Sequence, residues 1–124
     1  MAAHGTFVWF ELNTDDVAKA KAFYGKTLGW TFSEMTMGPG PAYTIVHSGE
    51  TMIGGIVTGM APPGTPPHWF DYLEVDDVDK RSAAFGSNGG AVIRPPFDIP
   101  NVGRIAIVRD SSGAVLGLMT SAPR

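Results

Sequence analysis

Two stretches of this sequence, residues 6–12 and 68–75, place aromatic, carboxylate and histidine side chains at the two-residue spacing of a β-strand. Because side chains alternate between the two faces of a strand, one face of each stretch carries aromatic rings with a few polar groups. Apolar walls with sparse polar groups are typical of sites for small molecules. The predicted ligand-binding residues, two of them from the last predicted strand, are Phe7, Trp9, Glu11, His68, Phe70, Tyr72, Glu74, Gly117 and Met119.

Glu11 is the candidate for acid–base chemistry on this face. A carboxylate that faces a ligand can act as a general base or hold a cationic ligand. The structural alternative is an ion pair with Arg94 or Arg104, or a place on a solvated rim. Glu11 is therefore the single candidate catalytic residue, with that alternative open.

The aromatic residues Trp9 and Phe70 also allow two interpretations. They can stack on a flat ligand, or they can fill the interior as core. His68 follows Pro66 and Pro67, which predicts a residue at the entry of a strand rather than a metal ligand.

The elements that position these residues form a pattern that occurs twice. Residues 6–12 are rich in aromatic and β-branched types, which predicts a strand. A helix follows, with Thr14 or Asp15 as its N-cap and with Gly29 as its end. The stripe that it buries is predicted to comprise Val17, Ala20, Tyr24 and Leu28, with Phe23 beside it.

A shift of 61 residues maps Asp15, Asp16 and Val17 onto residues 76–78, and Gly29 onto Gly90. We therefore expect a single domain of two βαβββ units, residues 5–59 and 68–121, joined by a proline-rich linker at 60–67. The predicted class is α+β, with curved mixed sheets around a cleft and the helices outside. The further strands are predicted at residues 30–35, 42–47, 51–58, 92–96, 104–108 and 115–120, with a turn at 37–41 and a break at Pro95-Pro96.

Composition narrows the class of protein. The chain has 124 residues, a formal net charge of -3 and no cysteine. The acidic balance argues against a nucleic-acid partner, and the lack of cysteine excludes thiolate chemistry and fits a reducing compartment. No stretch reaches the roughly 18 apolar residues of a membrane span, so we expect a soluble cytoplasmic protein.

The motifs resemble those of the vicinal oxygen chelate superfamily, the glyoxalase, bleomycin resistance protein and extradiol dioxygenase group. The resemblance is carried by residues 10–12 leading into 15–24 and 28–30, and by residues 75–78. The turn at residues 110–113 also matches, except that Ser111 stands where the family has proline.

The resemblance implies a metal site whose ligands would fall at Trp9, Gly55, Phe70 and Gly117. None of these side chains can coordinate a cation. The expectation is therefore a member without a metal cofactor that binds a small hydrophobic or aromatic molecule. The resemblance also implies a homodimer. One alternative is a lyase, isomerase or dioxygenase that uses Glu11 as base. It could act with or without a divalent metal, whose site would be shifted to His68, Glu11, Tyr72 and Glu74. A further alternative is a structural or regulatory interaction module.

Overall fold

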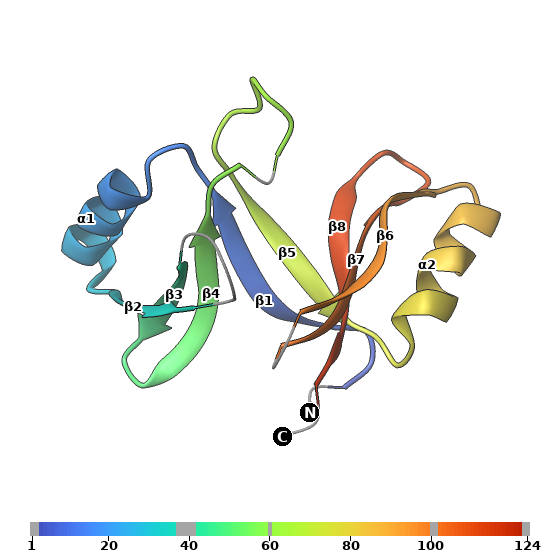
Figure 1. The fold of residues 1–124 in the computed structure, drawn as a ribbon, viewed down its shortest axis with the longest axis horizontal. Helices are drawn as coiled ribbons and strands as arrows, with labels where there is room; N and C mark the ends of the chain where they lie inside the picture. The colour runs from blue at the N-terminus through green and yellow to red at the C-terminus, as the bar shows by residue number, and fades with distance from the viewer. Residues whose placement is uncertain (1–2, 37–41, 60, 100–101, 123–124) are drawn as a thin grey trace. The chain divides into compact units, whose positions relative to one another are not determined.

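The computed structural model describes residues 3–36, 42–59, 61–99 and 102–122. Within these residues, two helices and eight strands follow one another as two βαβββ units, which confirms the predicted α+β class (Figure 1). The predicted turn at 37–41 and Met60 of the predicted linker lie outside the described residues. The elements are β1 (Thr6–Asn13), α1 (Val17–Leu28), β2 (Thr31–Met35), β3 (Tyr43–Ser48), β4 (Thr51–Val57), β5 (His68–Glu74), α2 (Val78–Ser87), β6 (Ala91–Ile99), β7 (Gly103–Arg109) and β8 (Val115–Ser121).

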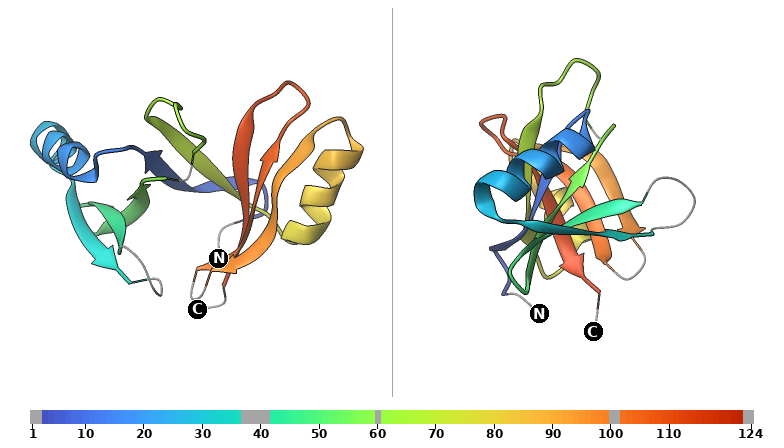
Figure 2. Two further views of the ribbon diagram at one scale, coloured as in Figure 1. Left: turned by 45° about the horizontal axis from the view of Figure 1, so that its top comes forward. Right: turned by 90° about the vertical axis from the view of Figure 1, so that its left-hand side faces the viewer.

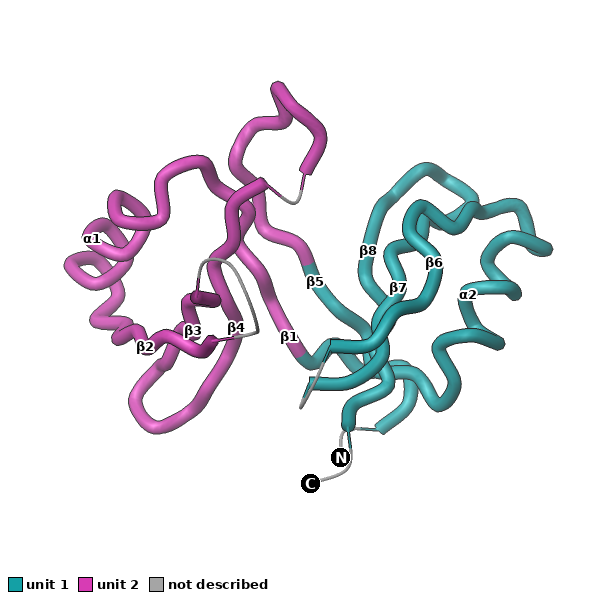
Figure 3. The backbone as a smooth tube through the Cα atoms, in the orientation of Figure 1, with its two compact units in different colours: residues 1–8, 71–124 teal, residues 9–70 magenta. Residues whose placement is uncertain are grey.

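The chain divides into two compact units (Figure 3). Unit 2 comprises residues 9–70, and unit 1 comprises residues 1–8 and 71–124. In the described part of the chain, neither helix is long and apolar enough to cross a membrane.

The sheet of unit 2 has the strand order β2-β3-β4-β1. β1 runs parallel to β4, and the other neighbours are antiparallel. The helix α1 lies on one face of this sheet (Figure 2). There Leu12, Val46 and Ile56 form a buried cluster, against which Val17, Ala20 and Tyr24 of the helix pack. The predicted helix residues Val17, Ala20 and Tyr24 therefore do face the sheet.

The ends of α1 show one correct and one wrong prediction. The helix ends at Gly29, which has φ 73 as a left-handed cap requires. The N-cap, however, is Asp16, whose carboxylate accepts a hydrogen bond from the Lys19 amide at 2.9 Å. Thr14 instead accepts a hydrogen bond from the Asp16 amide at 3.2 Å, so it shapes the turn before the helix.

Leu28 does not join the half-buried stripe of α1 that packs against the sheet. It is the last residue of the helix and is 57% exposed. Two residues later, Trp30 packs against the Leu12 cluster and supplies the apolar contact at this end of the helix.

The sheet of unit 1 has the strand order β5-β8-β7-β6, with α2 packed against β6, β7 and β8. Its buried core comprises Val75, Val78, Ala106, Val108 and Leu118. β6 continues through the prolines where we predicted a break. The register against β7 shifts between Arg94 and Phe97. Pro95 and Pro96, which have no backbone N–H to donate to the neighbouring strand, lie at this irregularity and do not end the strand.

Exposed ion pairs surround the start of α2. Arg81 donates two hydrogen bonds to the Asp76 carboxylate, at 2.8 and 2.9 Å. These bonds hold the pKa of Asp76 well below its usual range. Arg104 binds Asp79 in the same bidentate way and thereby lowers the pKa of that carboxyl.

Candidate functional site

A chain of hydrogen bonds joins three side chains on the face of the unit 2 sheet opposite α1. Trp9 Nε1 donates to the hydroxyl of Tyr43 at 3.0 Å, and that hydroxyl donates to Oε2 of Glu11 at 2.7 Å. Glu11 is only 7% exposed. The predicted residues Trp9 and Glu11 therefore meet through Tyr43, which we did not include among the predicted site residues.

Gly55 makes this arrangement possible. Glu11 pairs with Gly55 across β1 and β4, and Gly55 pairs with Ile45 across β4 and β3. A Cβ atom at position 55 would collide with the hydroxyl and ring of Tyr43. The missing side chain thus leaves the space through which a tyrosine on β3 reaches a carboxylate on β1.

A related arrangement occurs in unit 1. Tyr72 pairs with Gly117 across β5 and β8, and a Cβ atom at position 117 would collide with the Tyr72 ring. In both units, therefore, a tyrosine ring covers the glycine at the position where the family resemblance implies a metal ligand.

The remaining polar residue predicted on β5 within unit 1 is engaged by the neighbouring strand. The Glu74 carboxylate accepts hydrogen bonds from the backbone amide of Ser121, at 3.0 Å, and from its hydroxyl. Glu74 is 4% exposed and pairs with Met119, which is also buried. These contacts tie the end of β5 to the end of β8.

The other predicted residues lie in different settings. Phe7 is 50% exposed at the start of β1. Nδ1 of His68 lies 2.9 Å from the carbonyl oxygen of Pro66, which fits the predicted strand-entry position. Phe70, two residues further along β5, is half-buried.

Arg94 and Arg104, the two possible ion-pair partners predicted for Glu11, have the following contacts within unit 1. Arg104 pairs with Asp79 and lies 3.3 Å from Asp98. The Arg94 guanidinium lies 3.8 Å from the centroid of the Phe97 ring. Within residues 3–36, 42–59, 61–99 and 102–122, no group of three His, Asp or Glu side chains is placed to hold a metal ion.

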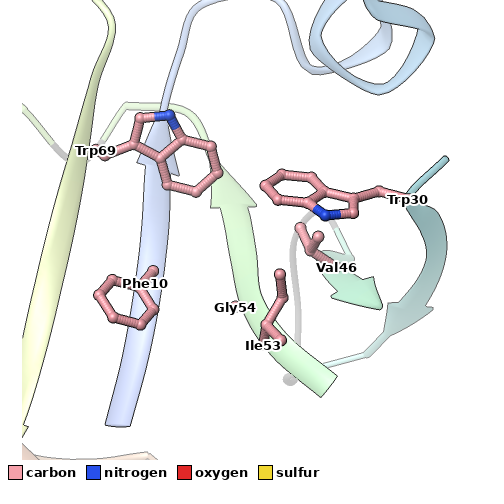
Figure 4. A pocket seen from close by; sticks show the side chains of 6 residues that line it. All are labelled: Phe10, Trp30, Val46, Ile53, Gly54 and Trp69. Carbon is pink, nitrogen blue, oxygen red and sulfur yellow. The ribbon is translucent and has the colours of Figure 1, made fainter. Parts of the chain in front are cut away.

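Unit 2 also contains a pocket of about 250 Å³ on the face that α1 covers in part. Its lining residues are Phe10, Trp30, Val46, Ile53, Gly54 and Trp69 (Figure 4). Phe10 alternates with Trp9 and Glu11 along β1 and so lies on the helix-side face, where it is 46% exposed and forms a wall of this pocket.

A strand irregularity contributes to the pocket. Val46 pairs with Gly54 but His47 pairs with Met52, so Ile53 is an extra residue on β4. Such a bulge breaks the alternation of side chains, and Ile53 joins the Leu12 cluster on the helix side. Alternation by itself could not predict this position.

Three functional candidates were therefore missed from the sequence: Tyr43, Trp30 and Trp69. For Tyr43 a signal existed, because Gly54-Gly55 within a predicted strand indicates that another group approaches the backbone closely. Nothing in the sequence indicated which side chain that would be.

A family model supports the resemblance found in the sequence. The model of the Glyoxalase/Bleomycin resistance protein/Dioxygenase superfamily matches residues 6–118.

Two curated relatives match nearly all of the chain. The putative glyoxylase CFP32 of Mycobacterium tuberculosis is 41% identical over 122 residues, which cover 97% of this chain and 46% of the relative. The anthracycline biosynthesis protein DnrV of Streptomyces peucetius is 28% identical over 129 residues, covering 94% of this chain and 47% of the relative. The chain thus spans about half the length of these relatives.

The fold also matches solved structures. Methylmalonyl-CoA epimerase from Mycobacterium tuberculosis has a TM-score of 0.70 at 16% identity, covering 99% of this chain and 94% of that one. At this identity the likeness concerns the fold alone.

Proposed function

Because the chain belongs to the Glyoxalase/Bleomycin resistance protein/Dioxygenase superfamily, we propose that it is a member without a metal cofactor that binds a small hydrophobic or aromatic molecule. The observation that carries the proposal is the network of Trp9, Tyr43 and Glu11 beside Gly55.

The side chains at the implied ligand positions support binding without a metal. Trp9 and Phe70 are aromatic, and Gly55 and Gly117 have no side chain and adjoin tyrosine rings. A divalent cation requires several oxygen, nitrogen or sulfur donors at fixed distances. An indole, a phenyl ring and two glycines supply none.

The same groups suit an aromatic ligand. Trp9 offers a flat ring whose orientation is held by its hydrogen bond to Tyr43, and a fixed ring stacks at little entropic cost. The phenol and the Glu11 carboxylate add polar groups that can orient a hydroxylated ligand. The name of DnrV concerns anthracycline biosynthesis, and anthracyclines are flat aromatic molecules, so hydroxylated anthraquinones are the first ligands to test.

The test combines metal analysis with ligand titration. Elemental analysis of protein purified without chelator should find no stoichiometric metal, and Mn, Fe(II), Co, Ni and Zn should leave the melting temperature unchanged. A hydroxylated anthraquinone should quench tryptophan fluorescence and raise the melting temperature. The quenching should largely disappear in Trp9→Phe and persist in Trp69→Phe, a control on the opposite face of the sheet. Stoichiometric metal lost on Glu11→Ala would contradict the proposal.

A second candidate function is an enzyme that uses Glu11 as a general base. It is favoured by the 2.7 Å hydrogen bond between the Tyr43 hydroxyl and the Glu11 carboxylate, since a carboxylate and a phenol in contact can exchange a proton with a bound substrate. A lyase or isomerase activity would then fall by about 100-fold or more in Glu11→Gln, while ligand binding is retained. Equal turnover by the wild-type protein and Glu11→Gln would exclude Glu11 as the general base.

A further inference from the structure

The polar side chains of β1 end with a buried amide. Side chains alternate along the strand, so Asn13 lies on the same face as Glu11, whereas Leu12 between them packs on the helix side. Asn13 is 8% exposed, and its Oδ1 has no hydrogen-bond partner among the residues that the structure describes. A buried carbonyl oxygen that accepts no hydrogen bond is uncommon in folded proteins and costs stability. Oδ1 of Asn13 is therefore a candidate acceptor for a ligand that brings its own hydrogen.

Asn13 lies near the hydrogen-bond network of the candidate site. β4 lies between β3 and β1 in the sheet, and Asn13 pairs with Val57, the last residue of β4. Tyr43 is the first residue of β3, which runs antiparallel to β4, so it lies at the same end of that strand. From there its hydroxyl reaches Glu11. The Asn13 amide and the network thus belong to one surface of unit 2.

The network uses its own donor hydrogens. An indole N–H can only donate, so the Tyr43 oxygen accepts from Trp9 and the Tyr43 hydrogen points to Glu11. A ligand carbonyl that approaches Trp9 or Tyr43 finds no hydrogen left to accept, whereas a ligand O–H or N–H can donate to Oδ1 of Asn13. The last torsion of an asparagine side chain is broad, so a modest rotation turns Oδ1 toward a ligand. The hydrogen-bonding capacity of this surface therefore favours ligands that donate.

We propose that Asn13 is a specificity-determining residue of this site and accepts a hydrogen bond from a ligand hydroxyl or amine. The inference rests on the proposed function and narrows it, because the aromatic ligand then has to carry a hydrogen-bond donor. A site with a buried acceptor rejects an analogue that lacks the donor, since binding of the analogue leaves the acceptor unpaired.

The test is fluorescence titration of the wild-type protein with a set of related compounds. These are an anthraquinone whose single hydroxyl lies away from the quinone carbonyls, its methyl ether, and the parent anthraquinone, all in mildly acidic buffer that keeps the hydroxyl protonated. The hydroxyl compound should bind about 10-fold or more tightly than the other two. In Asn13→Leu, which keeps the size of the side chain without the acceptor, this preference should disappear. Asn88→Leu, the same change at the C-cap of α2 in unit 1, is the matched control and should keep the preference.

A thermal melt gives a readout that needs no ligand. Asn13→Leu should leave the melting temperature unchanged or raise it, since an apolar side chain removes the cost of a buried acceptor that is not satisfied. A marked fall would show that Oδ1 has a structural role and would overturn the inference. Equal affinity of the wild-type protein for the hydroxyl compound and its analogues would also overturn it, while the proposed function would stand. Failure of all the compounds to bind would instead contradict the proposed function, and this inference with it.

Discussion

Replacing Tyr43 by phenylalanine tests whether the Trp9, Tyr43 and Glu11 network is a stabilising unit. The change removes only the hydroxyl, which donates to Glu11 at 2.7 Å and accepts from Trp9 at 3.0 Å. A hydrogen bond to a charged group contributes about 1.5–3 kcal/mol and a neutral one about 1 kcal/mol. We therefore expect a loss of about 3 kcal/mol in the free energy of unfolding, or a melting temperature lower by about 10 °C.

The assay is urea denaturation followed by circular dichroism, with Tyr24→Phe as the matched control. The Tyr24 hydroxyl accepts one longer hydrogen bond, 3.3 Å from Trp69 Nε1, at an exposed site. Its removal should cost about 1 kcal/mol or less. The double-mutant cycle of Tyr43→Phe with Glu11→Gln should give a coupling energy of about 1 kcal/mol or more. A loss for Tyr43→Phe no larger than that of Tyr24→Phe would refute the reasoning.

Three further predictions concern the fold. Gly54→Ala should prevent folding or lower the free energy of unfolding by more than about 3 kcal/mol. A Cβ atom at position 54 would collide with the backbone carbonyl oxygen of Phe10 in β1, which cannot move aside as a side chain could. A melting temperature near that of wild type would contradict this prediction. Asp16→Ala should cost about 1 kcal/mol in urea denaturation through the lost N-cap of α1, and Asp16→Asn, which can still cap, should recover most of it. The pKa of Asp76 is lowered by Arg81, so their pair stabilises the fold above the unfolded carboxyl pKa of about 4 and ceases to do so as the pH falls toward the lower folded value. Arg81→Gln should therefore lower the melting temperature slightly at pH 7, and the difference from wild type should shrink at acidic pH; a constant difference would show that the pair has no such effect.

Local signals predicted most of the elements correctly. Gly29 ends α1 because a left-handed cap favours glycine, and Val17, Ala20 and Tyr24 face the sheet because their spacing follows the helical period. The two wrong predictions, the N-cap of α1 and the burial of Leu28, concern the ends of the helix. There, neighbouring residues such as Thr14, Asp15 and Asp16 can each serve as the cap, and the local pattern does not decide between them.

The chemistry of the candidate site was predicted only in part. The alternation of β1 places Trp9 and Glu11 on one face, but their link through Tyr43 depends on the register of β1, β4 and β3 and on the space above Gly55. Strand register between distant segments depends on their packing as a whole, so no local pattern reveals it.

The sequence by itself determined the two βαβββ units and the glycine that ends α1, because these follow from residue type and spacing. It also determined that the positions where the family resemblance implies metal ligands carry no metal-ligating side chains. Only the tertiary structure decided that Trp30 and Trp69 line one pocket with Phe10, and that a bulge turns Ile53 toward it. These features join residues 10, 30, 53 and 69, and contacts at such separation are set by how strands and helix pack together rather than by any one segment.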